Sequence, residues 1–152
     1  LPKSLLCIGG GYIAFEFAHI AARAGADVTI LHRGEFPLEN FDRDIVQHLV
    51  DATRKLGIKL VLKTDVSKIE KKEDHYVVTG KSNGKETTYK TASVFNSAGR
   101  PPAIFDLDLE KAGISFSKKG ITVNDYLQST SNPNIYAAGD SILKDYPLPL
   151  LR

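Results

Sequence analysis

The first residues with a spacing suited to chemistry form a glycine-rich turn at positions 9–14, with the sequence GGGYIA. An apolar run, residues 5–8, precedes the turn and a helical pattern follows it, which is the context in which G-x-G-x-x-G/A binds a dinucleotide. Gly9 allows a sharp turn, Gly11 lets a pyrophosphate approach the backbone, and Ala14 fills the third small position. Free N–H groups of the first helical turn would hold the phosphates, whereas the alternative is a structural turn that binds nothing.

A second group, His32 and Arg33, follows the apolar run 28–31, about 20 residues after the glycines, where dinucleotide enzymes select their cofactor. NAD-using enzymes place a carboxylate at this position to bond the ribose 2′-OH, and His32 stands there instead. A guanidinium can pair with a phosphate through two hydrogen bonds, so Arg33 predicts a preference for NADPH. The alternative is an exposed loop charge beside a surface imidazole.

A third group, Gly139 and Asp140, follows the apolar run 135–138. A carboxylate at the end of a strand can accept hydrogen bonds from sugar hydroxyls, and a glycine before it gives a phosphate close access. Taken alone, a strand followed by a Gly-Asp turn is common and mostly structural.

The elements that position these groups predict an α/β fold, with a Rossmann-like parallel sheet built from βαβ units. We expect buried strands at 5–8 and 28–31, a third strand at 58–62 and a return strand at 92–95. The first helix is expected to bury Ile13, Phe17, Ile20, Ala21 and Ala24. The second helix, capped by Asn40 or Asp42, is expected to bury Ile45, Leu49, Ala52 and Leu56.

Between residues 65 and 90 the pattern changes to alternating apolar and polar side chains. Turn residues stand at Asp74 and at Asn83-Gly84, so the stretch predicts a meander of three antiparallel strands with one solvated face. Beyond the break at residues 96–102 the expected elements are short. They are a helical turn at 109–112 and strands at 121–123 and 135–138, followed by a tail without periodicity at 146–152.

Composition and charge exclude several classes of partner. The chain has 152 residues, with 20 basic and 18 acidic side chains and a formal net charge of +2. This balance argues against nucleic acid or an anionic membrane as a partner, and no apolar run approaches the ~20 residues of a membrane span. The lone Cys7 lies within an expected buried strand and is interpreted as a packing residue. We expect a cytoplasmic protein and no metal site.

The order of these motifs resembles the pyridine nucleotide–disulfide oxidoreductases, the group of glutathione reductase and dihydrolipoamide dehydrogenase. The resemblance rests on the glycine turn, the meander, residues 98–102 (AGRPP), residues 120–124 (GITVN) and residues 136–140 (YAAGD), and it covers essentially the whole chain. It implies that residues 1–98 are an NAD(P)H-binding domain and that residues 99–152 are a partial return into an FAD-binding domain.

The resemblance also implies roles for individual residues. Gly9, Gly11 and Ala14 match the pyrophosphate loop for NAD(P)H. Tyr12 matches a tyrosine that covers the flavin and moves aside for the nicotinamide. The other matched positions are Ile13 and Glu16 beside the nicotinamide, Gly99 and Arg100 near the nucleotide, and Gly139 and Asp140 at the FAD ribityl and pyrophosphate groups. Tyr12 and Glu16 are thus the candidate catalytic residues. The alternative interpretation is that Tyr12 is a partly exposed aromatic residue at a helix start and that Glu16 is a solvated charge on the helix.

One position departs from the family pattern. NADPH-using relatives carry a second basic residue six positions after the one matched by Arg33, and this chain has Glu39 there.

The implied function is the NAD(P)H-binding part of an FAD-dependent enzyme that passes a hydride from NADPH to flavin and on to a disulfide substrate. The chain lacks methionine and begins with Leu1 just before a core strand, so we expect a fragment, with N-terminal processing as the alternative. Its expected partners are NAD(P)H and the FAD and dimerisation domains of a homodimeric parent, and the fragment alone is expected to be inactive.

Two other functional classes stay open. One is a flavoenzyme without a redox disulfide, such as an NADH oxidase, an NADH dehydrogenase or a ferredoxin reductase. The other is a non-enzymatic nucleotide-sensing Rossmann domain, against which the meander and the Gly139-Asp140 turn argue.

Overall fold

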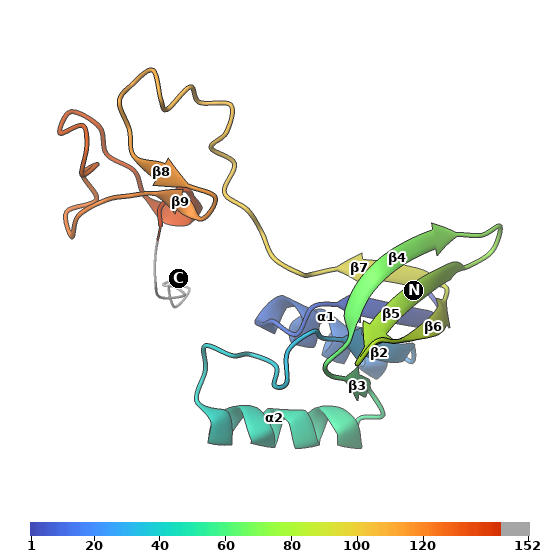
Figure 1. Ribbon diagram of the computed structural model, residues 1–152. Coiled ribbons are helices and arrows are strands. Elements are labelled where there is room, and N and C mark those ends of the chain that lie inside the picture. Colours follow the sequence, from blue (N-terminus) through green and yellow to red (C-terminus); the bar gives the residue numbers. More distant parts are fainter. Residues whose placement is uncertain (144–152) are drawn as a thin grey trace. The chain divides into compact units, whose positions relative to one another are not determined.

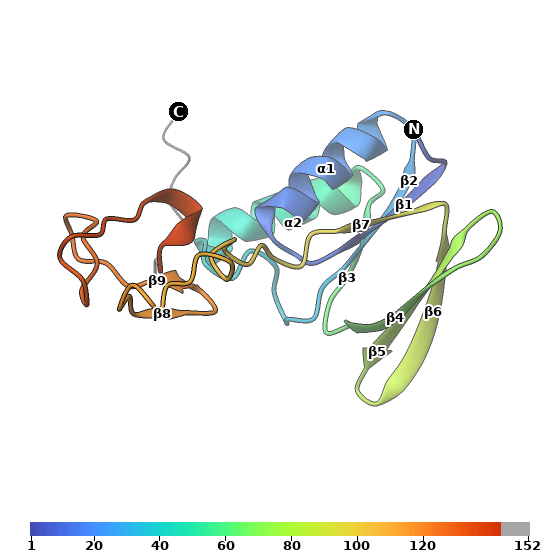
Figure 2. The same cartoon turned by 90° about the horizontal axis from the view of Figure 1, so that it is seen from above.

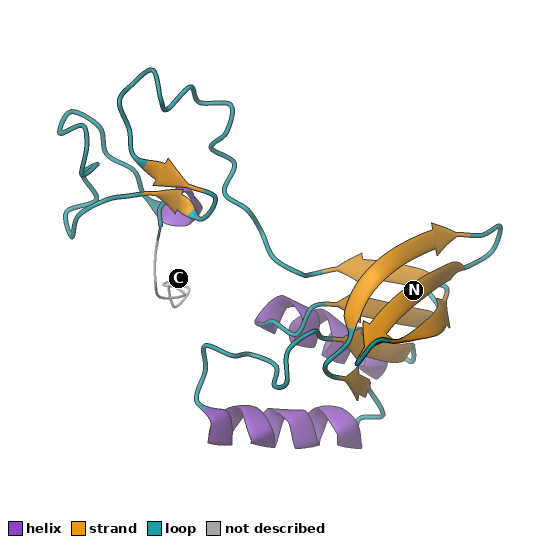
Figure 3. Cartoon of the chain, in the orientation of Figure 1, coloured by secondary structure: helices purple, strands orange, loops and turns teal. Residues whose placement is uncertain are grey.

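The computed structural model describes residues 1–143 of the chain (Figure 1). The chain divides into two units, Leu1–Gly99 and Arg100–Arg152. The first unit contains both α-helices and most of the strands, and the second is mostly loop (Figure 3).

A four-stranded parallel sheet forms the centre of the first unit, with the strand order β3-β2-β1-β7. Its strands are β1 (Ser4–Ile8), β2 (Asp27–Leu31), β3 (Lys59–Val61) and β7 (Ser93–Asn96). In the register of the sheet, Ile8 is paired with Leu31 on one side and with Asn96 on the other. The carboxyl ends of β1, β2 and β7 therefore meet at one edge, as the α/β prediction requires.

Two helices, α1 (Tyr12–Arg23) and α2 (Arg43–Lys55), cover one face of this sheet (Figure 2). Alternate strand residues point to the two faces, and Cys7, Val28 and Ile30 pack in the core shared with the helices. The side chain of Asp42 caps α2 by accepting hydrogen bonds from two backbone N–H groups, which settles the choice left open between Asn40 and Asp42.

The predicted buried faces of both helices are confirmed only in part, by Ala21 of α1, which is buried, and by Leu49 and Leu56, which are partly buried against the core. In α1 the buried side chains are Ala14, Phe15, Ala18 and Ala21. Phe17 and Ile20, expected inside, are 49% and 63% exposed. In α2 the buried side chains are Val46, Val50 and Thr53, while Ile45 is 70% exposed. Three alanines let one side of α1 approach the sheet closely, and Phe15 is the one large side chain of this helix that is buried there.

The meander is confirmed and covers the opposite face of the parallel sheet (Figure 2). It comprises β4 (Asp65–Lys71), β5 (Tyr76–Ser82) and β6 (Lys85–Thr91), all antiparallel. Val78 is completely buried and packs with Leu6 and Leu31 of the sheet, while the outer residues of β4 and β6 are largely exposed.

The second unit has less regular structure than expected. Among residues 100–143 its elements are β8 (Phe116–Ser117), β9 (Gly120–Ile121) and a single 3-10 turn, η1 (Gly139–Ser141). The predicted helical turn at 109–112 is a series of turns, and the predicted strand at 121–123 is reduced to β9. Residues 135–138 form only an isolated bridge, Gln128 to Tyr136, with backbone hydrogen bonds to Leu127 and Ser129 on either side of it. The expected tail at 146–152 lies outside the described residues.

Small apolar clusters hold each unit together separately. In the second unit the cluster contains Ile104, Leu109, Ile114 and Ile121. Within residues 1–143, no helix combines the length and the apolarity needed to cross a bilayer.

Candidate functional site

Gly9 joins the carboxyl end of β1 to the start of α1 in a conformation that favours glycine. Its φ is +108°, and a Cβ at this position would lie 2.6 Å from the backbone oxygen of Ser97. Its N–H donates to the carbonyl of Leu31 at 2.9 Å, which ties the turn to the end of β2. The predicted sharp turn is therefore present, and both the backbone angle and the neighbouring chain favour glycine.

Gly11 begins α1 and leaves the space in front of the helix open. It has φ −84° and ψ 174°, so its conformation is available to any residue, but an added Cβ would meet nothing within 4 Å. No side chain caps the helix and its first turn contains no acidic residue. The N–H groups at the positive end of the α1 dipole are thus free to bind an anion. Ala14, 0% exposed, packs against the sheet behind them.

The two candidate catalytic residues, Tyr12 and Glu16, lie one turn apart on the exposed side of α1. Both line an apolar groove of about 410 Å³ between α1 and α2, whose far wall includes Phe41 and Ile45. Tyr12 is 45% exposed, and Ile13 beside it is half-buried. The three side chains thus lie at the same end of α1 as the open space in front of Gly11.

His32 and Arg33 lie at the carboxyl end of β2 but differ in their surroundings. The ring of His32 packs over Gly10, where a Cβ would come within 2.5 Å of its Cγ atom. Its Nε2 is 3.0 Å from the carbonyl oxygen of Phe36, so both the ring face and this nitrogen already contact other groups of the chain. Arg33 is exposed and, among residues 1–143, makes no hydrogen bond or ion pair.

A loop at positions 34–39 folds back onto the glycine turn. The backbone N–H of Leu38 donates to the carbonyl of Gly10 at 2.9 Å. Leu38 has φ +53° and is buried together with Pro37, so both anchor the loop in the core. No pattern of residue types indicates this closure, because its hydrogen bond joins two backbone groups.

The end of β7 supplies the third side of the turn, through a residue that the sequence did not single out. Ser97 donates from its N–H and from its Oγ to the carbonyl of Ile8, at 2.9 and 2.8 Å. Gly99 follows with φ +131° and is exposed at the same edge of the sheet. The position of Ser97, directly before the Ala98-Gly99 pair at the end of the return strand, is the signal that could have found it.

Gly139 and Asp140 lie in the second unit, in η1. Gly139 has φ +70° and a Cβ there would meet nothing within 4 Å. The carboxylate of Asp140 forms an ion pair with the guanidinium of Arg100, and both side chains are well exposed. The structure thus places Arg100 beside Asp140, a pairing that the separate motifs did not predict.

His19 and Cys7 are among the titratable groups of the first unit whose pKa values are shifted. His19 of α1 lies 2.8 Å from the Oγ1 of Thr53 on α2, and Arg23 lies 3.0 Å from its other ring nitrogen. Burial, and then the charge of Arg23, lower the pKa of His19 below its usual 6.5. Burial raises the pKa of the Cys7 thiol to about 11, which fits a packing residue.

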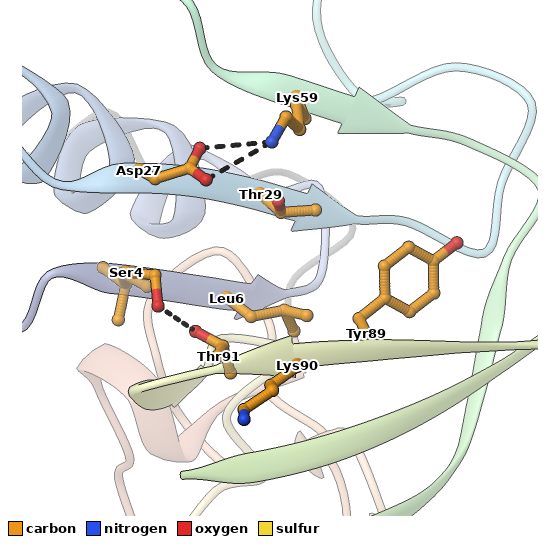
Figure 4. A pocket seen from close by; sticks show the side chains of 9 residues that line it. Ser4, Leu6, Asp27, Thr29, Lys59, Tyr89, Lys90 and Thr91 are labelled. Atoms are coloured by element: carbon orange, nitrogen blue, oxygen red, sulfur yellow. Dashed lines mark hydrogen bonds and ion pairs between the residues drawn. The ribbon is translucent and has the colours of Figure 1, made fainter.

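A second hollow lies at the opposite edge of the parallel sheet (Figure 4). It has a volume of about 170 Å³ and is lined by the amino ends of the strands, including Ser4, Asp27 and Lys59. Ligands of open α/β sheets bind at the carboxyl ends of the strands, so this hollow lies away from the candidate site at the glycine turn. In the described part of the chain, no group of three or more His, Cys, Asp or Glu side chains could hold a metal ion.

Comparison with known proteins identifies the family. The family model described as pyridine nucleotide-disulphide oxidoreductase matches residues 1–148. The chain belongs to this family. Dihydrolipoyl dehydrogenase of Geobacillus stearothermophilus is 34% identical over 142 residues, 93% of this chain and 30% of that protein. Mercuric reductase of Staphylococcus aureus is 34% identical over 144 residues, 94% of this chain and 26% of that protein.

Solved structures of pyridine nucleotide-disulphide oxidoreductases share the fold. The HOCl-induced flavoprotein disulfide reductase RclA from Escherichia coli matches with a TM-score of 0.78 and 33% identity, covering 93% of this chain and 32% of that chain. LpdA from Mycobacterium tuberculosis, 24% identical, matches with a TM-score of 0.82 over 93% of this chain and 30% of that chain, which supports the Rossmann-like fold. The family consists of oxidoreductases that depend on FAD and a pyridine nucleotide. This chain spans about a third or less of the length of these relatives.

Proposed function

We propose that this chain is the NAD(P)H-binding part of an FAD-dependent pyridine nucleotide–disulfide oxidoreductase. The observation that carries the proposal is the uncapped start of α1 behind Gly11, where N–H groups face open space. A pyrophosphate fits such a site because it supplies the negative charge and the acceptor oxygens that the helix terminus lacks. Gly9 and Ala14 support the same site, the first by its turn and the second by its close packing against the sheet.

The residues of α1 are proposed to receive the nicotinamide half of the cofactor. Nearly half of the surface of Tyr12 is exposed, which suits a side chain that covers the flavin and moves aside when the nicotinamide binds. Ile13 and Glu16 flank it and would orient the nicotinamide. In the whole enzyme these residues would hold the nicotinamide for transfer of a hydride to flavin. The two electrons and the proton of that hydride, with one further proton from solvent, would then convert a disulfide to two thiols.

The proposed cofactor is NADPH rather than NADH. Arg33 supports this preference because its guanidinium is exposed at the end of β2 and, in the described residues, is not neutralised by an ion pair. His32 adds a polar ring but is largely held by the glycine turn and by Phe36. An engineered water-forming NADPH oxidase bound to NADPH, 29% identical with a TM-score of 0.76, is a structural neighbour that uses this nucleotide.

The remainder of the chain is proposed to belong to a second domain. Residues 1–98 would be the NAD(P)H-binding domain and residues 99–152 a partial return segment of an FAD-binding domain. Gly99 would border the nucleotide, and Gly139 and Asp140 would contact the ribityl and pyrophosphate groups of FAD. The parent protein is proposed to be a cytoplasmic homodimer, in which this chain meets further FAD and dimerisation domains. The 152 residues alone are proposed to be inactive, since they hold only part of the flavin site.

A flavin-dependent oxidase without a redox disulfide is the second candidate, and the similarity to the engineered NADPH oxidase favours it. The two candidates share the nucleotide site and differ in the acceptor of the electrons. Assay of a parent enzyme with a disulfide and with oxygen as alternative acceptors would separate them.

The proposal is tested by the affinities of the chain for NADPH and NADH, measured by calorimetry. The Arg33→Ala variant should weaken NADPH binding by about tenfold and NADH binding by less than about twofold, because only NADPH has the 2′-phosphate. Arg54→Ala is the matched control: it removes an exposed arginine at the far end of α2 and should change neither affinity. An equal loss for both nucleotides with Arg33→Ala would contradict the NADPH assignment, and no binding of either nucleotide would contradict the proposed function.

A further inference from the structure

A carboxylate from the loop after β2, that of Glu39, lies beside the carboxyl end of this strand. Glu39 lies seven residues after His32, yet its Oε1 atom is 3.5 Å from the Nε2 atom of His32. The loop at 34–39 brings it there by folding back on the glycine turn. Gly34 faces both side chains and has no Cβ, which leaves room for the carboxylate beside the ring.

Backbone contacts of the residues directly before Glu39 fix its position. Pro37 and Leu38, directly before it, are buried, and the N–H of Leu38 is bonded to the carbonyl of Gly10. The carboxylate therefore starts from a fixed point next to the dinucleotide turn. The imidazole helps to orient it: both neighbours of Nε2, the Phe36 carbonyl and the Glu39 carboxylate, are acceptors, so Nε2 carries a hydrogen directed towards them.

The charge of Glu39 is not compensated. Glu35, on the same loop, is neutralised by Lys63, whose Nζ lies 2.6 Å from its Oε1. Glu39 has no lysine or arginine partner among residues 1–143, and its side chain is 65% exposed. At the rim of the proposed ribose site, Arg33 and Glu39 thus have no Lys, Arg, Asp or Glu partner of opposite charge among the described residues, while Arg43 stacks over the ring of Phe36 at 5.7 Å.

We propose that Glu39 is a specificity-determining residue that opposes the 2′-phosphate of NADPH and keeps the site open to NADH. A carboxylate near the end of β2 repels a phosphate and can accept a hydrogen bond from an unphosphorylated ribose 2′-OH. In this chain the loop after β2 supplies that carboxylate, whereas the strand end itself carries His32. Glu39 therefore reduces, without reversing, the preference for NADPH over NADH that Arg33 creates, so that the site prefers NADPH and also accepts NADH. This inference rests on the proposed function of the glycine turn.

The test compares the affinities of the 152-residue chain for NADP⁺ and NAD⁺ by calorimetry. The Glu39→Gln variant should raise the ratio of NADP⁺ to NAD⁺ affinity by about three- to tenfold, because one repulsive charge is lost at a solvent-exposed site. Glu39→Lys should raise it further in the same direction. Raising the salt concentration should shrink the difference between the parent and Glu39→Gln, because salt screens exposed charges.

Glu73→Gln is the matched control, since it removes one exposed carboxylate from the turn between β4 and β5 and changes the net charge equally. It should leave the ratio within about twofold of the parent. Binding of both nucleotides with an unchanged ratio in Glu39→Gln, or an equal change in Glu73→Gln, would overturn the role of Glu39 alone. No binding of either nucleotide to the parent would overturn the proposed function and this inference with it.

Discussion

The glycine turns at Gly9 and at Gly139 differ in how much regular secondary structure surrounds them. The first is enclosed by the carboxyl ends of three strands and opens into a helix of 12 residues. The second stands in a 3-10 turn of three residues, with Asp140 already paired to Arg100 on the surface. A turn of the first kind is complete within its own unit. A turn of the second kind needs further structure before it can bind a ligand.

This difference predicts that the same substitution has unequal effects at the two turns. Gly9→Ala should destabilise the first unit by about 2–5 kcal/mol, because it adds strain at positive φ and a Cβ overlap with Ser97. Gly139→Ala should cost only about 1–2 kcal/mol, the strain alone, since no atom lies near the added Cβ. Amide hydrogen exchange reports the opening free energy of each unit separately, and equal losses at both turns would break the comparison.

At the first turn, folding and binding should be separable. Gly11→Ala should change the free energy of unfolding by less than about 1 kcal/mol, because its Cβ would meet nothing within 4 Å. The same methyl group should weaken NADPH binding by about tenfold or more, because it fills the space through which the pyrophosphate approaches. Chemical unfolding and calorimetry on one preparation measure both quantities. If Gly11→Ala bound NADPH as tightly as the parent, the pyrophosphate would not bind in front of Gly11.

The free energy of unfolding of the first unit should also depend on pH, through His19 of α1. Since the pKa of His19 is lowered in the folded chain, the unfolded chain binds more protons and stability falls with falling pH. The contribution of His19 is complete above pH 6.5 and is lost as the pH drops through that value towards the folded pKa. His19→Gln should flatten the stability of the first unit across this range, measured by urea unfolding at several pH values. A parent curve as flat as that of the variant would contradict this account.

The smallest effect is expected at the second turn. Arg100→Gln removes the ion pair with Asp140, and because both side chains are exposed the second unit should lose less than about 1 kcal/mol. Hydrogen exchange at the amides near Ile142 would measure this loss. A loss as large as that of Gly9→Ala would show that the second turn is as firmly built as the first.

The same contrast explains how much could be predicted from the sequence. In the first unit, strand runs such as 28–31, the Asn83-Gly84 turn and the glycine motif are local signals, and each predicted element formed there. In the second unit, residues 135–138 are apolar and extended in pattern, but they pair with residues 127–129 through a single bridge only, so no full strand forms. Local pattern predicts a strand only where the fold supplies a neighbour to bond with.

Helix faces and loop closures lie beyond what the pattern can decide. Residues 45 and 46 begin two equally periodic apolar series, and only packing shows that Val46 faces inwards. Thr53 has a polar side chain, so the apolar pattern did not predict its burial. Its hydroxyl forms hydrogen bonds with His19 and with the carbonyl of Leu49. The approach of Glu39 to His32 likewise depends on a loop whose anchor is a backbone hydrogen bond.

Titration of the isotopically labelled chain with NADP⁺, followed by amide chemical shifts, tests the central claim most directly. We predict saturable shifts at the glycine turn, residues 9–14, and at Arg33, with residues 139–140 unaffected. Shifts confined to the hollow at the opposite sheet edge, around Ser4, Asp27 and Lys59, would contradict the assignment of the dinucleotide site, and so would the absence of any shift.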